Sequence, residues 1–400
     1  KTSENNTDQD EFNTSKTLSY TDIEAEVAWD LNLALPKKYK FIYFRIWGCA
    51  NHSTFSYLHE CGFIVLEEFS SFCDNKERYF YFYYRLLGEK ARFVISILAS
   101  RLKDDKILYL LDAKAKVFMV LRDPFGILKT WANHTHPNQA KINPFNLSYN
   151  PVKILDSVAY DAGKCPNVEA MHYGALAYSL RIYEYLFFFK NREIIAIDAK
   201  DLVPQAVMQT FTKLSKILNF KMPENENYFK DKKNSSTLHF LLPLTLILDE
   251  NDIDKIEDLS SLSLDEKISV IIATPLQSWR YDKKEFRELE VKANQECKFF
   301  ISKNDYEKLQ GNKKLFDFSL KYLQKFLHSL DERLKIEAQK QINEKDILEY
   351  FYENKEQRKK YQKIFKQNFD FFDQRFPQIV QSWNYYQNFN QLCEELDEKV

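Results

Sequence analysis

The sequence predicts a three-layer α/β fold, in which a parallel β-sheet lies between two layers of helices. Four short apolar runs have the character of buried strands, at residues 41–46, 63–66, 116–121 and 193–197. Apolar side chains at spacings of 4, 3 and 4 residues predict helices over 176–187 and 207–218. Strands that alternate with helices in this way are typical of parallel sheets with crossover connections.

The pattern of polar and apolar residues changes along the chain, which predicts three parts. Residues 1–18 are polar and are expected to form a disordered tail or linker. Residues 19–223 hold the strand and helix alternation and form the predicted core. Beyond a polar loop, residues 224–400 contain two strand-like runs and then long charged helices, so we expect a mainly helical extension.

Composition excludes several classes of protein. The formal net charge is −1, which gives no overall field toward nucleic acid or membrane. The six cysteines lack CxxC spacing, which favours a reducing compartment over disulfides or a zinc site. No apolar run reaches membrane-spanning length. We therefore expect a cytoplasmic protein of bacterial type, compatible at most with peripheral association with a membrane.

A first candidate site follows the predicted strand 41–46. The strand leads into a loop with Gly48 and then into a helix whose first turn carries His52, Ser53 and Thr54. Free backbone N–H groups and the positive end of the helix dipole make such a junction suitable for an anion. The simpler alternative is that Ser53 only caps the helix. The loop is not a Walker A loop, because GxxxxGK followed by Ser or Thr is absent.

A second junction of the same kind follows the strand 116–121. This strand ends on Arg122-Asp123-Pro124, and Thr130 follows Arg122 by eight residues inside the next predicted helix. Arg122 paired with Asp123, with Pro124 starting the helix, is the structural alternative. If the two strands are neighbours, their carboxyl ends create two phosphate sites on one edge of the sheet. A nucleotide with phosphates at its 5′ and 3′ positions fits that arrangement.

These stretches resemble the sulfotransferase family. "VFMVLRDPFGILKTWANH" is similar to its 3′-phosphate motif, and the loop at Gly48 lies where the family places its 5′-phosphosulfate loop. "YSLRIYEYLFFFKNREIIAIDAKDLVPQAVMQTFTKLSKILNFKMP" resembles a later family segment, and "KERYFYF" at 76–82 resembles "KExxYF" of the carbohydrate sulfotransferases. The resemblance covers roughly residues 40–223 and implies a sulfotransferase-like, P-loop-type fold.

The loop departs from the family at a position that matters for chemistry. Aligning Ser53 and Thr54 on the family's hydroxyl pair puts Ala50 where a lysine meets the leaving phosphate, and His52 where a glycine stands. The chain also resembles the capsular phosphoramidate transferases of low-GC enteric bacteria. That resemblance implies a donor of 3′-phosphocytidine-5′-diphosphoramidate and a capsular sugar hydroxyl as acceptor. The alternative donor is 3′-phosphoadenylyl sulfate (PAPS).

The resemblance and the residue types together assign roles. Gly48, Ala50, Asn51, His52, Ser53 and Thr54 are expected to bind the donor's 5′ side, and Arg122 and Thr130 its 3′-phosphate. Arg45 or His52 would supply the missing charge. The resemblance makes Glu77 the general base, with Lys76 touching the donor, and His52 is the rival base. No metal is expected.

The acceptor side is less defined. His172 could face the rim of the site, and Trp279 could stack on a sugar ring if residues 224–400 form an acceptor lobe. The reaction predicted is transfer of a phosphoramidate or sulfuryl group to a carbohydrate hydroxyl. A non-catalytic binding module on the same fold is the alternative that the missing lysine favours. A glycosyltransferase is disfavoured because residues 40–223 lack a DxD motif.

Overall fold

A computed structural model describes most of the chain. Nothing is described of residues 1–18, so the predicted N-terminal tail lies outside it. The described residues are 19–67, 74–88, 91–98, 105–136, 142–156, 159–160, 163–225, 227–230, 242–253, 256, 264, 266–281, 284–291 and 297–397. None of the helices in these ranges is long and apolar enough to cross a bilayer.

The first sheet is parallel and has five strands in the order β2-β3-β1-β4-β8. They are β1 (Tyr39–Arg45), β2 (Ile64–Leu66), β3 (Phe93–Leu98), β4 (Val117–Leu121) and β8 (Ile194–Asp198). The four predicted strands are confirmed, and the sequence prediction missed β3. All six residues of β3 are buried, as expected for a strand inside a sheet that is covered on both faces.

The strand order places a crevice between β1 and β4. These two strands are direct neighbours, with Ile42 opposite Val117 and Phe44 opposite Met119. The chain leaves β1 through α2 (Asn51–Glu60) toward β2 at one edge, whereas it leaves β4 toward β8 at the other edge. Connections that diverge from adjacent parallel strands open a ligand crevice at their carboxyl ends. Both predicted phosphate junctions lie at this point.

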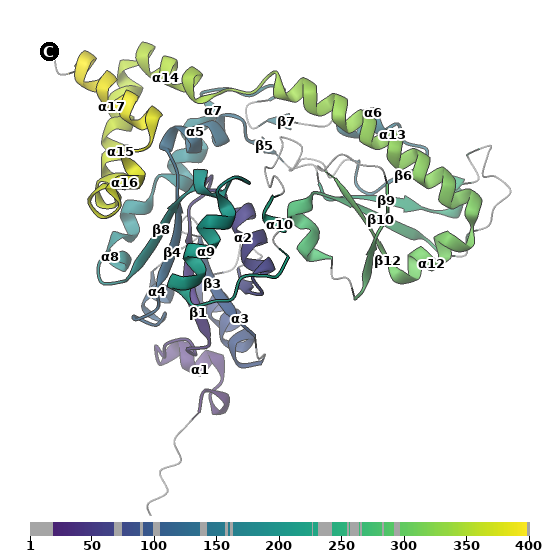
Figure 1. The fold of residues 1–400 in the computed structure, drawn as a ribbon, viewed down its shortest axis with the longest axis horizontal. Coiled ribbons are helices and arrows are strands. Elements are labelled where there is room, and N and C mark those ends of the chain that lie inside the picture. The colour runs from purple at the N-terminus through teal and green to yellow at the C-terminus, as the bar shows by residue number, and fades with distance from the viewer. Residues whose placement is uncertain are drawn as a thin grey trace, which may run out of the picture.

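Helices cover both faces of the first sheet, which confirms the predicted α/β fold (Figure 1). The helical segments of this part are η1 (Tyr20–Asp22), α1 (Ala25–Asp30), α2, α3 (Asn75–Gly88), α4 (Lys106–Tyr109), α5 (Pro124–Ala132), α7 (Ala170–Gly174), η4 (Ala175–Ser179), η5 (Ile182–Tyr185), α8 (Leu186–Phe189), η6 (Ala199–Leu202), α9 (Val207–Leu218) and α10 (Asn227–Lys230). Helix α9 matches its predicted span, and its four predicted apolar positions are all buried.

The other predicted helix, 176–187, is broken into three pieces. A π-helix, η4, ends before Leu180, and the chain resumes as the 3₁₀ helix η5 and then as α8. The buried side chain of Asn368 binds the break: its Oδ1 accepts from the Ile182 N–H at 2.8 Å, and its Nδ2 donates to the Leu180 carbonyl at 3.1 Å. Asn368 satisfies backbone groups that a continuous helix would have paired internally.

A second lobe is built around a mixed sheet of order β11-β12-β10-β9-β6. Its elements are β6 (Phe145–Asn146), α6 (Pro151–Leu155), β9 (Leu244–Leu248), α11 (Glu250–Ile253), β10 (Ile268–Ala273), η8 (Pro275–Arg280), β11 (Phe286–Glu288), β12 (Lys298–Ser302), α12 (Lys303–Gly311) and α13 (Lys313–Ala338). A short pair, β5 (Thr135–His136) and β7 (Ala159–Tyr160), lies beside it. Buried side chains of β9, β10, β12 and α13 form a hydrophobic core of its own.

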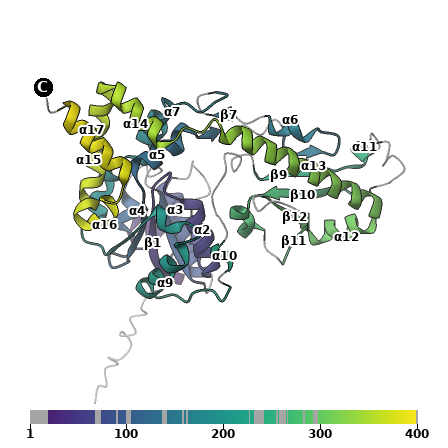
Figure 2. The ribbon, with the colours of Figure 1, turned by 45° about the horizontal axis from the view of Figure 1, so that its top comes forward.

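The structure divides the chain differently from the predicted boundary at 223/224. Residues 145–155, placed in the predicted core, pack in the hydrophobic core of the second lobe. Residues 224–400 are mainly helical as predicted, and their two strand-like runs form β9 and β10. The C-terminal helices α14 (Glu344–Glu353), α15 (Lys355–Arg375), α16 (Pro377–Val380) and α17 (Asn384–Asp397) return to the first core. Figure 2 shows α13 lying along the second lobe, with the segment after it leading to α14 beside the first sheet.

The break in 176–189 leads to a prediction about Asn368. We expect Asn368→Ala to lower the free energy of unfolding by about 2–3 kcal/mol, because the buried backbone groups of Leu180 and Ile182 lose their partner. Chemical denaturation measures the change. The exposed Asn388 of α17 is the control, and Asn388→Ala should stay within about 0.5 kcal/mol. Equal stability of the two variants would show that Asn368 does not hold the break.

Candidate functional site

The loop after β1 is held in a tight conformation by Asn51. The Asn51 amide donates to the Ile46 carbonyl at 2.9 Å and accepts from the Tyr43 hydroxyl at 3.0 Å. Between them, Gly48 has φ +80° and Ala50 has φ 52°, so the loop passes twice through the left-handed region. A non-glycine residue there stores strain on the order of 1–2 kcal/mol, a feature that clusters at functional sites. Asn51 is therefore a positioning residue of the loop.

The hydroxyls and the imidazole at the start of α2 differ in accessibility. Thr54 is fully buried, and its hydroxyl donates to the Ala50 carbonyl at 3.0 Å, so it closes the first turn of the helix. Ser53 is half-buried and His52 is exposed. Cys49 is buried, and burial raises the pKa of its thiol to about 12, which keeps it neutral. Among these side chains, Ser53 and His52 are the ones that reach solvent.

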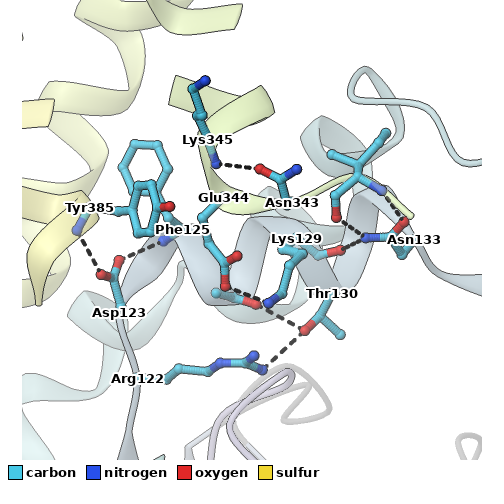
Figure 3. A network of polar contacts seen from close by, with 12 residues as sticks. Arg122, Asp123, Phe125, Lys129, Thr130, Asn133, Asn343, Glu344, Lys345 and Tyr385 are labelled. Carbon is cyan, nitrogen blue, oxygen red and sulfur yellow. Dashed lines mark hydrogen bonds and ion pairs between the residues drawn. The ribbon is translucent and has the colours of Figure 1, made fainter. Parts of the chain in front are cut away.

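Arg122 links the two strand-end junctions. Its Nη1 donates to the Gly48 carbonyl oxygen at 2.6 Å and to Thr130 Oγ1 at 3.1 Å. Figure 3 shows the guanidinium extending from the end of β4 toward Thr130 of α5. The predicted pair of Arg122 and Thr130 is thus in direct contact, and it also touches the loop after β1. The Arg122 guanidinium therefore lies between the loop after β1 and helix α5.

Gly126 provides the space for this guanidinium. A Cβ atom built on Gly126 would lie 2.6 Å from Arg122 Nε and 3.2 Å from its Cζ. Any side chain at this position of α5 would displace the guanidinium from Gly48 and Thr130. The glycine in "RDPFG" is explained by this close approach.

Asp123 turns the other way, toward the C-terminal helices. Its Oδ1 accepts from the Phe125 N–H at 2.9 Å and caps α5, and its Oδ2 accepts from the Tyr385 N–H of α17 at 3.2 Å (Figure 3). Burial raises the pKa of Asp123 to about 6, although these two N–H groups counteract it. Arg122 and Asp123 do not pair with each other among the described contacts, so the arginine's partners are the loop and Thr130.

The charge near the loop comes from two arginines. Arg45, 7% exposed at the end of β1, pairs with Glu67 at 3.3 Å, and its guanidinium lies 4.8 Å from the centroid of the Phe55 ring. Part of His52 reaches solvent, but the packing around its imidazole desolvates the ring, and this lowers the pKa of His52 to about 4. The positive charges of Arg280 and Arg45 lower the pKa further. His52 is therefore a neutral imidazole at pH 7.

Lys76 and Glu77 make their contacts elsewhere. Lys76 pairs with Glu26 of α1 at 2.9 Å and lies over the Phe80 ring. Glu77 forms a reciprocal cap of α3: the Glu77 N–H donates to Asp74 Oδ1 at 2.9 Å, and Glu77 Oε2 accepts from the Asp74 N–H. No described contact brings either side chain to the strand ends. Their roles as base and donor contact stay predictions.

The predicted acceptor residue His172 contacts the C-terminal helices. His172 is held between two tyrosines, with Nδ1 at 3.0 Å from the Tyr361 hydroxyl and Nε2 at 2.8 Å from that of Tyr350. Burial lowers its pKa, although Glu169 opposes the shift. It ties α7 to α14 and α15. Trp279 lies in η8, but its side chain is outside the part of the structure that is described.

The sequence analysis missed an aromatic cluster beside the Arg122 contact. Trp131, next to Thr130, stacks on Tyr178 at 5.6 Å between ring centroids, and Trp47, next to Gly48, lies 6.0 Å from Trp131. Ser179 joins them: its hydroxyl accepts from Trp131 Nε1 at 2.8 Å and donates to the Trp47 carbonyl at 3.1 Å. Tyr178 and Ser179 belong to the π-helix η4, a type of segment that is frequent at functional sites.

Comparison with known proteins places the chain in a family. Residues 196–396, a little over half of the chain, match the model of a family described as "Protein of unknown function (DUF2972)". The chain belongs to this family. No curated protein matches it.

The fold comparison is weaker. The crystal structure of mouse sulfotransferase SULT7A1 complexed with PAP is similar at 9% identity and a TM-score of 0.31, over 52% of this chain and 66% of that one. The chain thus spans just under two thirds of that protein's length. Similarity of this size carries no argument about function.

The close approach at α5 leads to a prediction. Gly126→Ala should gain about 1 kcal/mol of helix propensity. Displacement of Arg122 should lower the free energy of unfolding by more than this gain, because hydrogen bonds to a charged group contribute about 1.5–3 kcal/mol each. We expect a net loss of roughly 1 kcal/mol or more in the free energy of unfolding, measured by denaturant titration.

The matched control is Gly311→Ala at the end of α12, where a Cβ would meet no atom within 4 Å. This variant should be neutral or up to about 1 kcal/mol more stable. A gain in stability for Gly126→Ala as well would show that the Arg122 contacts contribute nothing.

Proposed function

We propose that this protein is a group transferase that binds a 3′-phosphorylated nucleotide at the carboxyl ends of β1 and β4. The observation that carries the proposal is the contact of Arg122 with Thr130 and Gly48 at the point where the two strand connections diverge. An arginine fork suits a phosphate, and the N-terminus of α2 favours a second one. Two anion positions on one sheet edge suit a 3′,5′-bisphosphonucleotide.

The reaction we propose is transfer of a phosphoramidate group to a sugar hydroxyl of a capsular polysaccharide or its precursor. The acceptor oxygen attacks the terminal phosphorus and loses its proton to a base, while the bond to the 5′-phosphate oxygen breaks. The nucleotide 3′,5′-bisphosphate leaves with the electron pair of that bond. The choice of phosphoramidate and of a capsular acceptor rests on the sequence resemblance. A sulfuryl group from PAPS is the alternative.

Positive charge and aligned dipoles are the means of catalysis that the chain offers. Backbone N–H groups at the start of α2 and the half-buried Ser53 can meet the charge that grows on the leaving phosphate. Arg122 and Thr130 would fix the donor through its 3′-phosphate. Trp47 and Tyr178, which are half-buried and packed around the buried Trp131, would be the aromatic side chains beside the donor for a sugar ring.

The general base remains open between His52 and Glu77, and its assignment can be tested. We expect the larger loss of turnover from His52→Gln, about 10²–10⁴-fold in kcat, because His52 lies in the first turn of α2 and its neutral imidazole can accept a proton at pH 7. Glu77→Gln is the comparison, since glutamine can keep the reciprocal cap of α3. A larger loss from Glu77→Gln would restore the assignment that the resemblance implies.

Arg122 gives the direct test of donor binding. We expect Arg122→Ala to weaken binding of a 3′,5′-bisphosphonucleotide by roughly 10- to 100-fold, because charge-assisted hydrogen bonds contribute about 1.5–3 kcal/mol each. The variant should also lose its preference for that ligand over the same nucleotide without a 3′-phosphate. Calorimetry with both ligands measures the preference.

The control for this test is Arg192→Ala. Arg192 also bonds backbone carbonyls, donating to that of Asp112 at 2.5 Å, but it precedes β8 at the opposite end of the sheet. The Arg192→Ala variant should be less stable than the unmutated protein but should keep its preference for the 3′-phosphorylated nucleotide. If Arg122→Ala discriminates between the two nucleotides as the unmutated protein does, Arg122 is structural and the proposal fails. In that case the non-catalytic module becomes the better hypothesis.

A further inference from the structure

The loop after β1 has no strong cation of its own. Residues 46–54, "IWGCANHST", contain neither lysine nor arginine, and His52 is neutral at pH 7. A transferred group that leaves a bisphosphate behind requires positive charge near the breaking bond. If the proposed function is right, the charge must come from another part of the chain.

The two arginines at the strand ends are already engaged. Arg45 is buried, pairs with Glu67 and stacks on Phe55, so its charge is largely compensated. Arg122 is held against Gly126 by its bonds to Gly48 and Thr130 and occupies the position of the 3′-phosphate contact. Neither is placed to replace the missing lysine of the loop.

The second lobe brings a third arginine to the same place. Its short helix η8 packs against α2, the helix that follows the loop. Arg280 is the last residue of η8 and is exposed. Of the two arginines whose charges act on His52, Arg280 has the larger influence on its pKa. Arg280 thus ends the element of the second lobe that packs against α2, and its positive charge acts on His52 in the first turn of that helix.

Contacts within the second lobe fix η8 at both of its ends. At the start, the side chain of Gln277 accepts from the Thr274 N–H at 3.0 Å and donates to the Leu242 carbonyl at 2.8 Å. Thr274 and Gln277 are both buried. At the end, the Tyr281 ring stacks on Phe300 of β12, with centroids 4.7 Å apart. Arg280 therefore stands on a rigid turn, which is what a binding residue requires.

We propose that Arg280 is a donor-binding residue, which the second lobe presents to the 5′ side of the bound nucleotide at the N-terminus of α2. It would take the place that a loop lysine has in the sulfotransferase family, and it would offset the charge on the leaving phosphate as the bond to the transferred group breaks. This inference rests on the proposed function. The site is then complete only when both lobes are in place.

The test uses the full chain with two probes, adenosine 3′,5′-bisphosphate and cytidine 3′,5′-bisphosphate, each compared with its nucleoside 3′-monophosphate. Arg280→Gln should weaken binding of the preferred bisphosphate by roughly 10- to 100-fold in calorimetry. Binding of the 3′-monophosphate should change by less than about twofold, because Arg280 serves the 5′ side. Arg122→Ala should show the opposite pattern, with loss of the 3′-phosphate contribution.

Two controls separate this role from a general loss of structure or charge. Arg287→Gln removes an exposed arginine of the same lobe that lies over the Tyr306 ring, and it should leave both affinities unchanged. In the ligand-free protein, NMR titration should show the pKa of His52 rising in Arg280→Gln and unchanged in Arg287→Gln, since a nearby positive charge has been removed in the first variant only.

The outcomes are distinct. If Arg280→Gln binds the bisphosphate as tightly as the unmutated protein, the inference about Arg280 is overturned, whatever happens to the pKa of His52. The proposed function would still stand if Arg122→Ala had lost its 3′-phosphate preference. If the unmutated protein binds neither bisphosphate, the proposed function fails and the role of Arg280 fails with it.

Discussion

The junction between β4 and α5 is the constraint on which the candidate site depends. Two adjacent residues point in opposite directions there: Arg122 bonds the loop after β1, while Asp123 caps α5 and also accepts from the backbone of α17. Pro124, directly after them, is the first residue of α5. The loop, the sheet and the C-terminal helices therefore meet across a few residues of backbone. A change in the direction of α5 would move Thr130 away from the Arg122 guanidinium.

The C-terminal helices act as a support for α5. Phe125 packs its ring against Phe351 of α14 and Phe389 of α17, with centroids 5.9 and 5.6 Å apart. On the same helix, Lys129 pairs with Glu344, and the Asn133 amide bonds both backbone groups of Ile342 (Figure 3). The DUF2972 match at 196–396 includes these helices and the second lobe, but not the loop after β1 or Arg122. The matched region thus includes the elements that pack against α5 and α2.

The candidate site shows where sequence reasoning succeeds and where it fails. The eight-residue spacing from Arg122 to Thr130 spans a strand end and two helical turns, so local geometry alone brings them together. For Glu77, local geometry supplied a different partner, Asp74, three residues earlier. For His172, the partners Tyr350 and Tyr361 lie far along the chain, and nothing in the residues around it indicates them.

The sequence by itself determined four strands of the first sheet, the span of α9 and the start of α5, because each depends on periodicity or capping within a few residues. Three features were decided only by the tertiary structure: the helix break near Leu180 that Asn368 binds, the place of 145–155 in the second lobe, and the packing of η8 against α2. The physical reason is the range of the interactions. An apolar pattern records which face of an element is buried, whereas the element that covers it is chosen by packing and hydrogen bonds between distant parts of the chain.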